Sequence, residues 1–84
     1  MMKKVDFSLD MLKKIVSGKV KGMCVIENFT IVNITFQEGS HWVVVWIDMR
    51  GQSIPYVYHL SSGEPDADGL PPLELYIEEK EKEG

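Results

Sequence analysis

The spacing of apolar residues near the amino terminus predicts one short amphipathic helix. In 'DFSLDMLKKIVSGK' the apolar residues that recur at helical spacing are Leu9, Leu12, Ile15 and Val16. Lysines fall on the opposite side, Asp6 or Ser8 can cap the first turn, and Gly18 can end the helix. We therefore expect a helix over about residues 8–17. Because so short a helix is marginal alone, its apolar side must dock on the rest of the domain.

Beyond residue 20 the pattern changes to one that is typical of strands. The stretch 'GMCVIENFTIVNITF' is rich in β-branched residues, and 'ENFT' predicts a turn between two strands. In the second of these strands Val32, Ile34 and Phe36 share one face. The segment 'QEGS' predicts a loop, and 'HWVVVWIDMRGQSIPYVYHL', residues 41–60, predicts two further strands joined at 'DMRG'.

The last part of the chain predicts a loop, a final strand and a tail. The segment 'SSGEPDADGLPP' has the composition of an exposed loop. In residues 73–79 the alternation of Leu73, Leu75 and Ile77 favours a strand, although Pro71 and Pro72 before them would also suit a short helix. Residues 80–84 are charged, and we expect them to be disordered.

Together these elements predict one small α+β domain over residues 1–79. A chain of 84 residues has room for a single core. We expect the short helix to pack on a strongly curled antiparallel β-meander of about five strands, closing into a small roll or barrel.

The turn around Arg50 decides which side chains of the hairpin share a face. A two-residue loop requires a positive φ at Arg50, whereas a type I turn with a bulge requires it only at Gly51. We therefore expect the bulged turn, which places His41 opposite His59. Pro55 cannot donate to a ladder, so its strand is an edge strand or is bulged there. In this register one face carries Trp42, Val44, Trp46, Ile54, Tyr56 and Tyr58.

The open end of the hairpin provides the first candidate site, for a protein partner. Trp, Tyr and Arg dominate the energetics of protein interfaces. The candidate residues are Trp42, Tyr56, Tyr58, His41, His59 and Arg50. An unpaired sheet edge beside Pro55 is a second possible docking surface, and it would also permit homo-oligomers. The alternative for the aromatic residues is packing in the core, since both faces of strand 41–48 are apolar.

The distribution of charge suggests a second function, an acidic inhibitor or nucleic-acid mimic that occupies a basic groove. The net charge is −4, and residues 1–22 hold six of the nine basic residues, which leaves the remainder of the chain strongly acidic. The candidate acidic surface comprises Glu64, Asp66, Asp68, Glu74, Glu78 and Glu79. The acidic balance argues against direct nucleic-acid binding, because phosphate contacts need a basic surface.

Catalysis and metal binding have weaker support. His41 and His59 could supply two nitrogen ligands to zinc, but such a site needs at least one more protein ligand, such as Cys24 or Asp48. Cys24 lies inside an apolar strand, where we expect an inert thiol. The sequence has no nucleophile-elbow serine and no glycine-rich phosphate loop, so we expect no enzyme and no cofactor. The single cysteine and the absence of an export signal or a long apolar run favour the cytoplasm and no membrane association.

One more set of motifs runs along most of the chain. A helix that opens with 'FSLD' and closes with 'SGK' is followed by a strand ending in 'YH', a loop with 'DG', and 'LELYI' before a Glu/Lys run. This order resembles that of small uncharacterised proteins of phages and mobile elements from gut bacteria. The resemblance implies an accessory protein of a phage or mobile element, and it implies no activity and no site residue.

Overall fold

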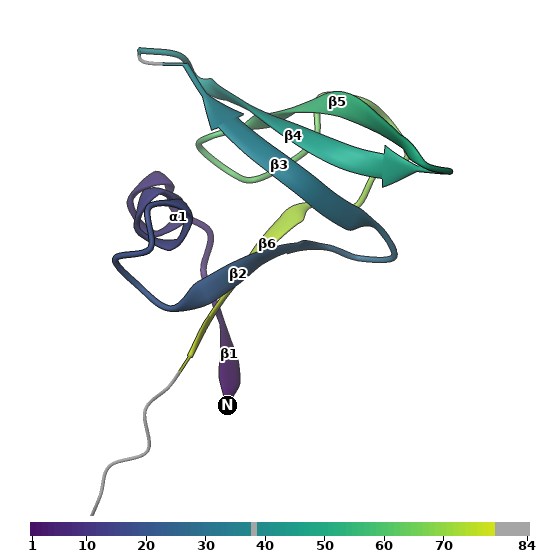
Figure 1. Ribbon diagram of the computed structural model, residues 1–84. Coiled ribbons are helices and arrows are strands. Elements are labelled where there is room, and N and C mark those ends of the chain that lie inside the picture. Colours follow the sequence, from purple (N-terminus) through teal and green to yellow (C-terminus); the bar gives the residue numbers. More distant parts are fainter. Residues whose placement is uncertain (38, 79–84) are drawn as a thin grey trace, which may run out of the picture.

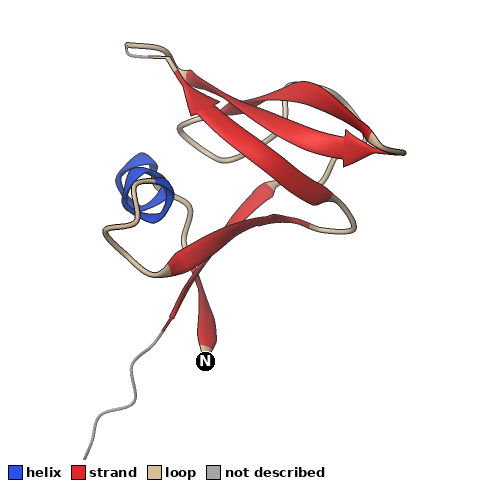
Figure 2. Ribbon diagram, in the orientation of Figure 1, coloured by secondary structure: helices blue, strands red, loops and turns tan. Residues whose placement is uncertain are grey.

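The computed structural model describes residues 1–37 and 39–78. Within them, two three-stranded antiparallel sheets and one short helix form a small α+β domain (Figures 1 and 2). We call the sheet with strand order β1-β6-β2 sheet A and the sheet with strand order β3-β4-β5 sheet B. The elements along the chain are β1 (Met2–Val5), α1 (Leu9–Val16), β2 (Gly22–Ile26), β3 (Thr30–Phe36), β4 (Trp42–Met49), β5 (Gln52–His59) and β6 (Leu73–Glu78). The predicted tail at 80–84 and the candidate Glu79 lie outside the described residues.

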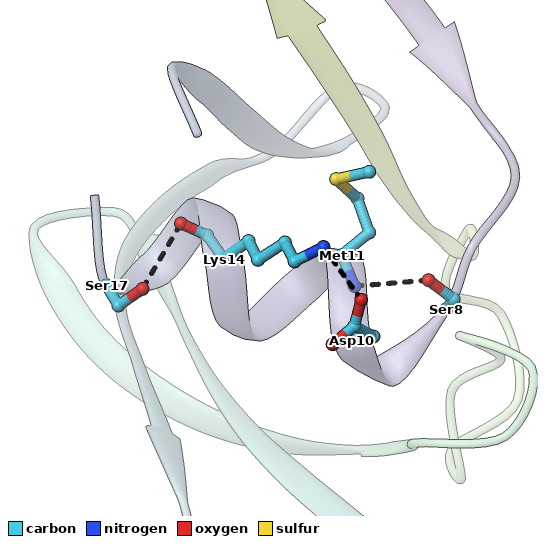
Figure 3. Close-up of polar contacts among 5 residues, drawn as sticks. All are labelled: Ser8, Asp10, Met11, Lys14 and Ser17. Atoms are coloured by element: carbon cyan, nitrogen blue, oxygen red, sulfur yellow. Dashed lines mark hydrogen bonds and ion pairs between the residues drawn. The ribbon is translucent and has the colours of Figure 1, made fainter. Parts of the chain in front are cut away.

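Helix α1 confirms the prediction to within one residue at each end. At its start the Ser8 hydroxyl accepts a hydrogen bond from the Met11 N–H at 3.1 Å (Figure 3). After its end Gly18 adopts a φ of 81°, a conformation that glycine reaches without steric cost. Asp10 and Lys14, one turn apart, form an ion pair at 3.0 Å (Figure 3). The caps that the sequence offers are thus the ones that the helix uses.

The turn at 'ENFT' is present, but the two strands that it joins do not pair with each other beyond it. Asn28 has a φ of 68°, and a single bridge links Ile26 with Phe29. Beyond this bridge β2 pairs with β6, whereas β3 pairs with β4. The prediction of one continuous meander that closes into a roll or barrel is therefore wrong. Because β2 and β3 pair with different strands and not with each other, the chain forms two separate sheets that are not closed between β2 and β3.

Sheet A is built around β6. Residues 73–78 form a strand, as favoured, and this strand pairs on one side with β2 and on the other with β1. β1, 'MKKV', was not predicted, because only Val5 is partly buried in it and no alternation of apolar and polar residues results. The prediction of about five strands is one too low for this reason.

A single core joins the two sheets and the helix. In Figure 1, α1 and sheet A lie on the same side of sheet B. The buried residues come from α1, β2, β4, β5, β6 and the loop after β5: Leu12, Ile26, Val43, Val45, Ile47, Tyr58, Leu60, Leu73 and Leu75. No helix in the described part of the chain is long and apolar enough to cross a membrane.

Strand β3 departs from the predicted alternation at one residue. A register shift between Ile31 and Asn33 marks a bulge, and Val32 within it is 57% exposed. Ile34 and Phe36 are partly buried against the core, as expected. The prediction that Val32 shares their face is wrong because the extra residue of the bulge interrupts the two-residue period.

Candidate functional site

The hairpin of β4 and β5 has the two-residue turn and not the predicted bulged turn. Both Arg50 and Gly51 have positive φ, 54° and 84°, and the turn between Met49 and Gln52 contains only these two residues. The ladder pairs Trp42 with His59 and shifts the predicted pairing of β4 and β5 by one residue. The predicted bulged turn is therefore wrong, and so is the pairing of His41 with His59.

Burial of side chains explains why this register wins. Positive φ at a residue with a side chain costs about 1–2 kcal/mol. Shifting β5 by one residue would turn Tyr58 to the other face of the sheet, whereas in the structure it is fully buried opposite Val43. Burying one large apolar side chain is worth about 1.5–3 kcal/mol. In addition, the Tyr58 hydroxyl donates to the Pro71 carbonyl at 2.9 Å. The gain from Tyr58 outweighs the strain at Arg50.

Pro55 fits this register without losing a hydrogen bond. β5 is an edge strand of sheet B, one of the two positions that Pro55 predicted. The Val57 carbonyl accepts from the Asp66 N–H at 2.9 Å, and the His59 N–H donates to the Glu64 carbonyl at 2.8 Å. Residues 55, 57 and 59 alternate with those that bond to β4, and they direct their backbone groups away from it. The missing N–H of Pro55 therefore falls outside the ladder. Because segment 64–66 covers the edge at residues 57–59, that part of the edge is not open to a further strand.

The register also determines the outer face of sheet B, the face turned away from the core. Tyr56 and Tyr58 pair with Val45 and Val43 and point to the core side, so the predicted aromatic set is split. The outer face instead carries Trp42, Val44 and Trp46 from β4, Pro55, Val57 and His59 from β5, and Asn33 and Thr35 from β3. The core and the helix lie on the other side of the sheet (Figure 1).

Trp42, His59 and Asp66 come together at one end of the outer face. The rings of Trp42 and His59, direct cross-strand partners, have centroids 4.3 Å apart and are tilted by 48°. His59 Nε2 lies 3.7 Å from Asp66 Oδ1, a distance that permits an ion pair when the imidazole is protonated. Ser40 Oγ accepts a hydrogen bond from the Trp42 N–H at 3.1 Å. His41 is exposed, and its carbonyl accepts from the Leu60 N–H at 2.8 Å.

A pocket of about 300 Å³ opens beside Trp42. Its lining residues come from the loop before β4, from both strands of the hairpin and from the loop after β5: Gln37, Ser40, Trp42, Val44, Val57 and Asp66. Sequence reasoning missed Gln37, Ser40, Val44 and Val57 as members of a site. The signal that could have revealed Val57 is the two-residue period that places it with Pro55 and His59.

The predicted two-histidine metal site does not form as expected. Because Trp42 occupies the position opposite His59, the imidazole of His41 is not its cross-strand neighbour. In residues 1–37 and 39–78, no group of three His, Cys, Asp or Glu side chains is placed to hold a metal ion. Cys24 is half-buried in β2, and burial raises the pKa of its thiol to about 11. A thiol protonated at neutral pH is a poor ligand and a poor nucleophile.

The candidate acidic residues separate into two groups. Glu64, Asp66 and Asp68 are exposed in the loop after β5. Glu74 and Glu78 lie on β6, where each forms an ion pair with a lysine, at 2.6 Å with Lys4 and at 3.5 Å with Lys21. The hydrogen bond to Glu74 raises the pKa of Lys4. The lysines offset the charge of the β6 group, which leaves the loop as the acidic part of the described surface next to sheet B.

Arg50 lies too far away to join the Trp42 end. It occupies the hairpin turn, at the opposite end of the eight-residue β4, about 25 Å from Trp42 at the usual rise per residue. Of the predicted partner-binding residues, the structure therefore brings together Trp42 and His59 on the outer face.

No family model, no curated protein and no solved structure matches the chain.

Proposed function

We propose that this protein is a non-enzymatic binding module that docks another protein on the outer face of sheet B. The observation that carries the proposal is the exposure of Trp42, 40%, beside Val57, 38%, on a sheet face with the core on its other side. An exposed tryptophan among apolar neighbours is the usual centre of a protein interface. In the setting that the sequence resemblance implies, the module would be an accessory protein of a phage or mobile element.

The size of the outer face suits the centre of an interface. Strands of eight residues are about 25 Å long, and three of them span about 15 Å, so the face covers about 400 Å². A typical partner contributes about 800 Å² to a stable interface. The outer face would supply the apolar centre, and the polar loop after β5 would supply part of the rim.

Affinity capture from a lysate of the source organism tests the proposal. The test variant is Val57→Arg, which places a charge at the centre of the outer face. The matched control is Met23→Arg, on the 49% exposed Met23 of β2 in sheet A. We expect wild type and Met23→Arg to retain the same partner and Val57→Arg to lose at least ten-fold in recovery. Equal recovery by all three folded proteins, checked by circular dichroism, would contradict the proposal.

The acidic-mimic alternative now depends on the loop carboxylates, because the lysines Lys4 and Lys21 offset those of β6. Salt separates the two functions. Binding by many carboxylates weakens steeply between about 50 mM and about 500 mM salt, because salt screens the attraction between exposed charges. An apolar interface with one ion pair weakens little. A steep loss of the captured partner with salt would favour the acidic mimic.

A further inference from the structure

Two hydrogen bonds, one between backbone groups and one from a backbone N–H to a serine hydroxyl, fix segments around the pocket beside Trp42. The Asp66 N–H donates to the Val57 carbonyl at 2.9 Å, which fixes the loop against β5. The Ser40 hydroxyl accepts from the Trp42 N–H at 3.1 Å, which fixes the start of β4. Trp42 and Asp66, two of the lining residues, are therefore placed by the fold, although they are far apart in the sequence.

Among the described residues, the lining of the pocket combines three apolar residues and the polar Gln37 and Ser40 with one acidic residue, Asp66. Trp42, Val44 and Val57 provide an aromatic and two aliphatic surfaces, and Asp66 provides the carboxylate. The side chain of Asp66 is 62% exposed, and His59 approaches it only to 3.7 Å, so its oxygens retain room for a closer donor. A complementary ligand has an apolar stem and a cationic end.

We propose that this pocket receives an arginine side chain of the docked protein. The inference rests on the proposed function and names the chemistry of its partner. A guanidinium is planar, stacks on an indole ring and can donate two parallel hydrogen bonds to the carboxylate of Asp66. The aliphatic part of the arginine side chain would lie on Val44 and Val57, while its guanidinium plane would stack on the indole ring of Trp42.

The charges around the pocket favour a basic partner. Glu64 and Asp68 flank Asp66 in the same exposed loop. Arg50, the one arginine of the chain, lies about 25 Å away at the other end of the hairpin and does not neutralise this loop. These carboxylates would repel the phosphates of a nucleic acid, so a protein partner fits this surface better than a nucleic acid does.

The proposal can be tested with the intact protein and short peptides. The probe is acetyl-Gly-Arg-Gly-amide, and its control carries citrulline, which has nearly the shape of arginine without the charge. A single side chain is expected to bind with a Kd of about 1 mM. We expect saturable NMR shifts at the Trp42 indole and the methyl groups of Val44 and Val57, and at least ten-fold weaker binding of the citrulline peptide.

Two variants of the loop assign the charge to one carboxylate. Asp66→Asn should weaken binding of the arginine peptide about ten-fold, whereas Asp68→Asn, in the same loop but outside the pocket lining, should leave it within about two-fold. Equal binding of arginine and citrulline peptides, shifts elsewhere on the surface, no binding at all, or unchanged binding to Asp66→Asn would each overturn the proposal. A lysine peptide that binds as tightly as the arginine peptide would overturn the choice of arginine.

These outcomes are distinct from those of the capture experiment. If Val57→Arg abolishes capture but the arginine peptide does not bind at Trp42, the outer face is a docking surface for a partner of other chemistry. If the arginine peptide binds as expected but capture does not depend on Val57, the pocket recognises guanidinium groups and the proposed docking function is wrong.

Discussion

Replacing Arg50 by asparagine should make the protein more stable. Arg50 is exposed and has a φ of 54°, a left-handed conformation that costs a residue with an ordinary side chain about 1–2 kcal/mol. Asparagine tolerates this conformation better, and Asn-Gly is the preferred pair of the two-residue hairpin turn. Because the Arg50 side chain is exposed, little packing is lost. We expect Arg50→Asn to gain about 1 kcal/mol, which corresponds to about 4–8 °C in Tm for a domain of this size.

Urea unfolding followed by tryptophan fluorescence measures this difference. Gln52→Asn, at the exposed first residue of β5, is the control for a general effect of asparagine, and we expect no gain there. Gly51→Ala should lose about 1 kcal/mol through backbone strain alone, since a Cβ at Gly51, with its φ of 84°, would meet no atom within 4 Å. A bulged turn needs no positive φ at Arg50. An Arg50→Asn protein no more stable than wild type would therefore refute the two-residue turn and the register that follows from it.

Two further substitutions and one chemical modification test the packing of the domain. Gly63→Ala should lose about 3 kcal/mol in urea unfolding, because Gly63 has a φ of 76° and a Cβ there would lie 2.8 Å from a ring carbon of Phe7. Tyr58→Phe should lose about 1 kcal/mol in the same assay, since it removes the hydrogen bond to the Pro71 carbonyl; an unchanged midpoint would contradict that contact. The raised pKa of Cys24, about 11 against 9.0, should slow its alkylation by iodoacetamide at pH 8 about 100-fold relative to the unfolded chain, as mass spectrometry can follow.

Local features of the sequence were sufficient to predict the elements with strong local signals. Helix α1 was predicted because its caps and apolar spacing all lie within one segment. The strand at 73–78 and the edge position of β5 followed from alternation and from Pro55. β1 could not be predicted in this way, because its lysine-rich residues become a strand only by pairing with β6, more than 70 positions later in the chain.

The candidate site was predicted less well, for a physical reason. Turn strain at Arg50 is visible in the sequence, whereas the burial of Tyr58 that opposes it depends on the second sheet and on Pro71. Turn strain alone therefore favours the wrong register, in which Tyr58 shares the face of Trp42. The proximity of Asp66 to Trp42 arises from the loop that returns along β5, which no periodicity reveals.

The register of the β4–β5 hairpin decides which side chains form the outer face, and NMR can measure it directly. In an antiparallel pair, directly opposed residues that exchange no hydrogen bonds bring their Hα atoms close together. Val57 directs its carbonyl to Asp66, so Val44 and Val57 form such a pair. We expect strong Hα–Hα NOEs between Val44 and Val57 and between Trp42 and His59. An Hα–Hα NOE between Val44 and Tyr56 instead would place Tyr56 and Tyr58 on the face of Trp42 and contradict the docking surface proposed for sheet B.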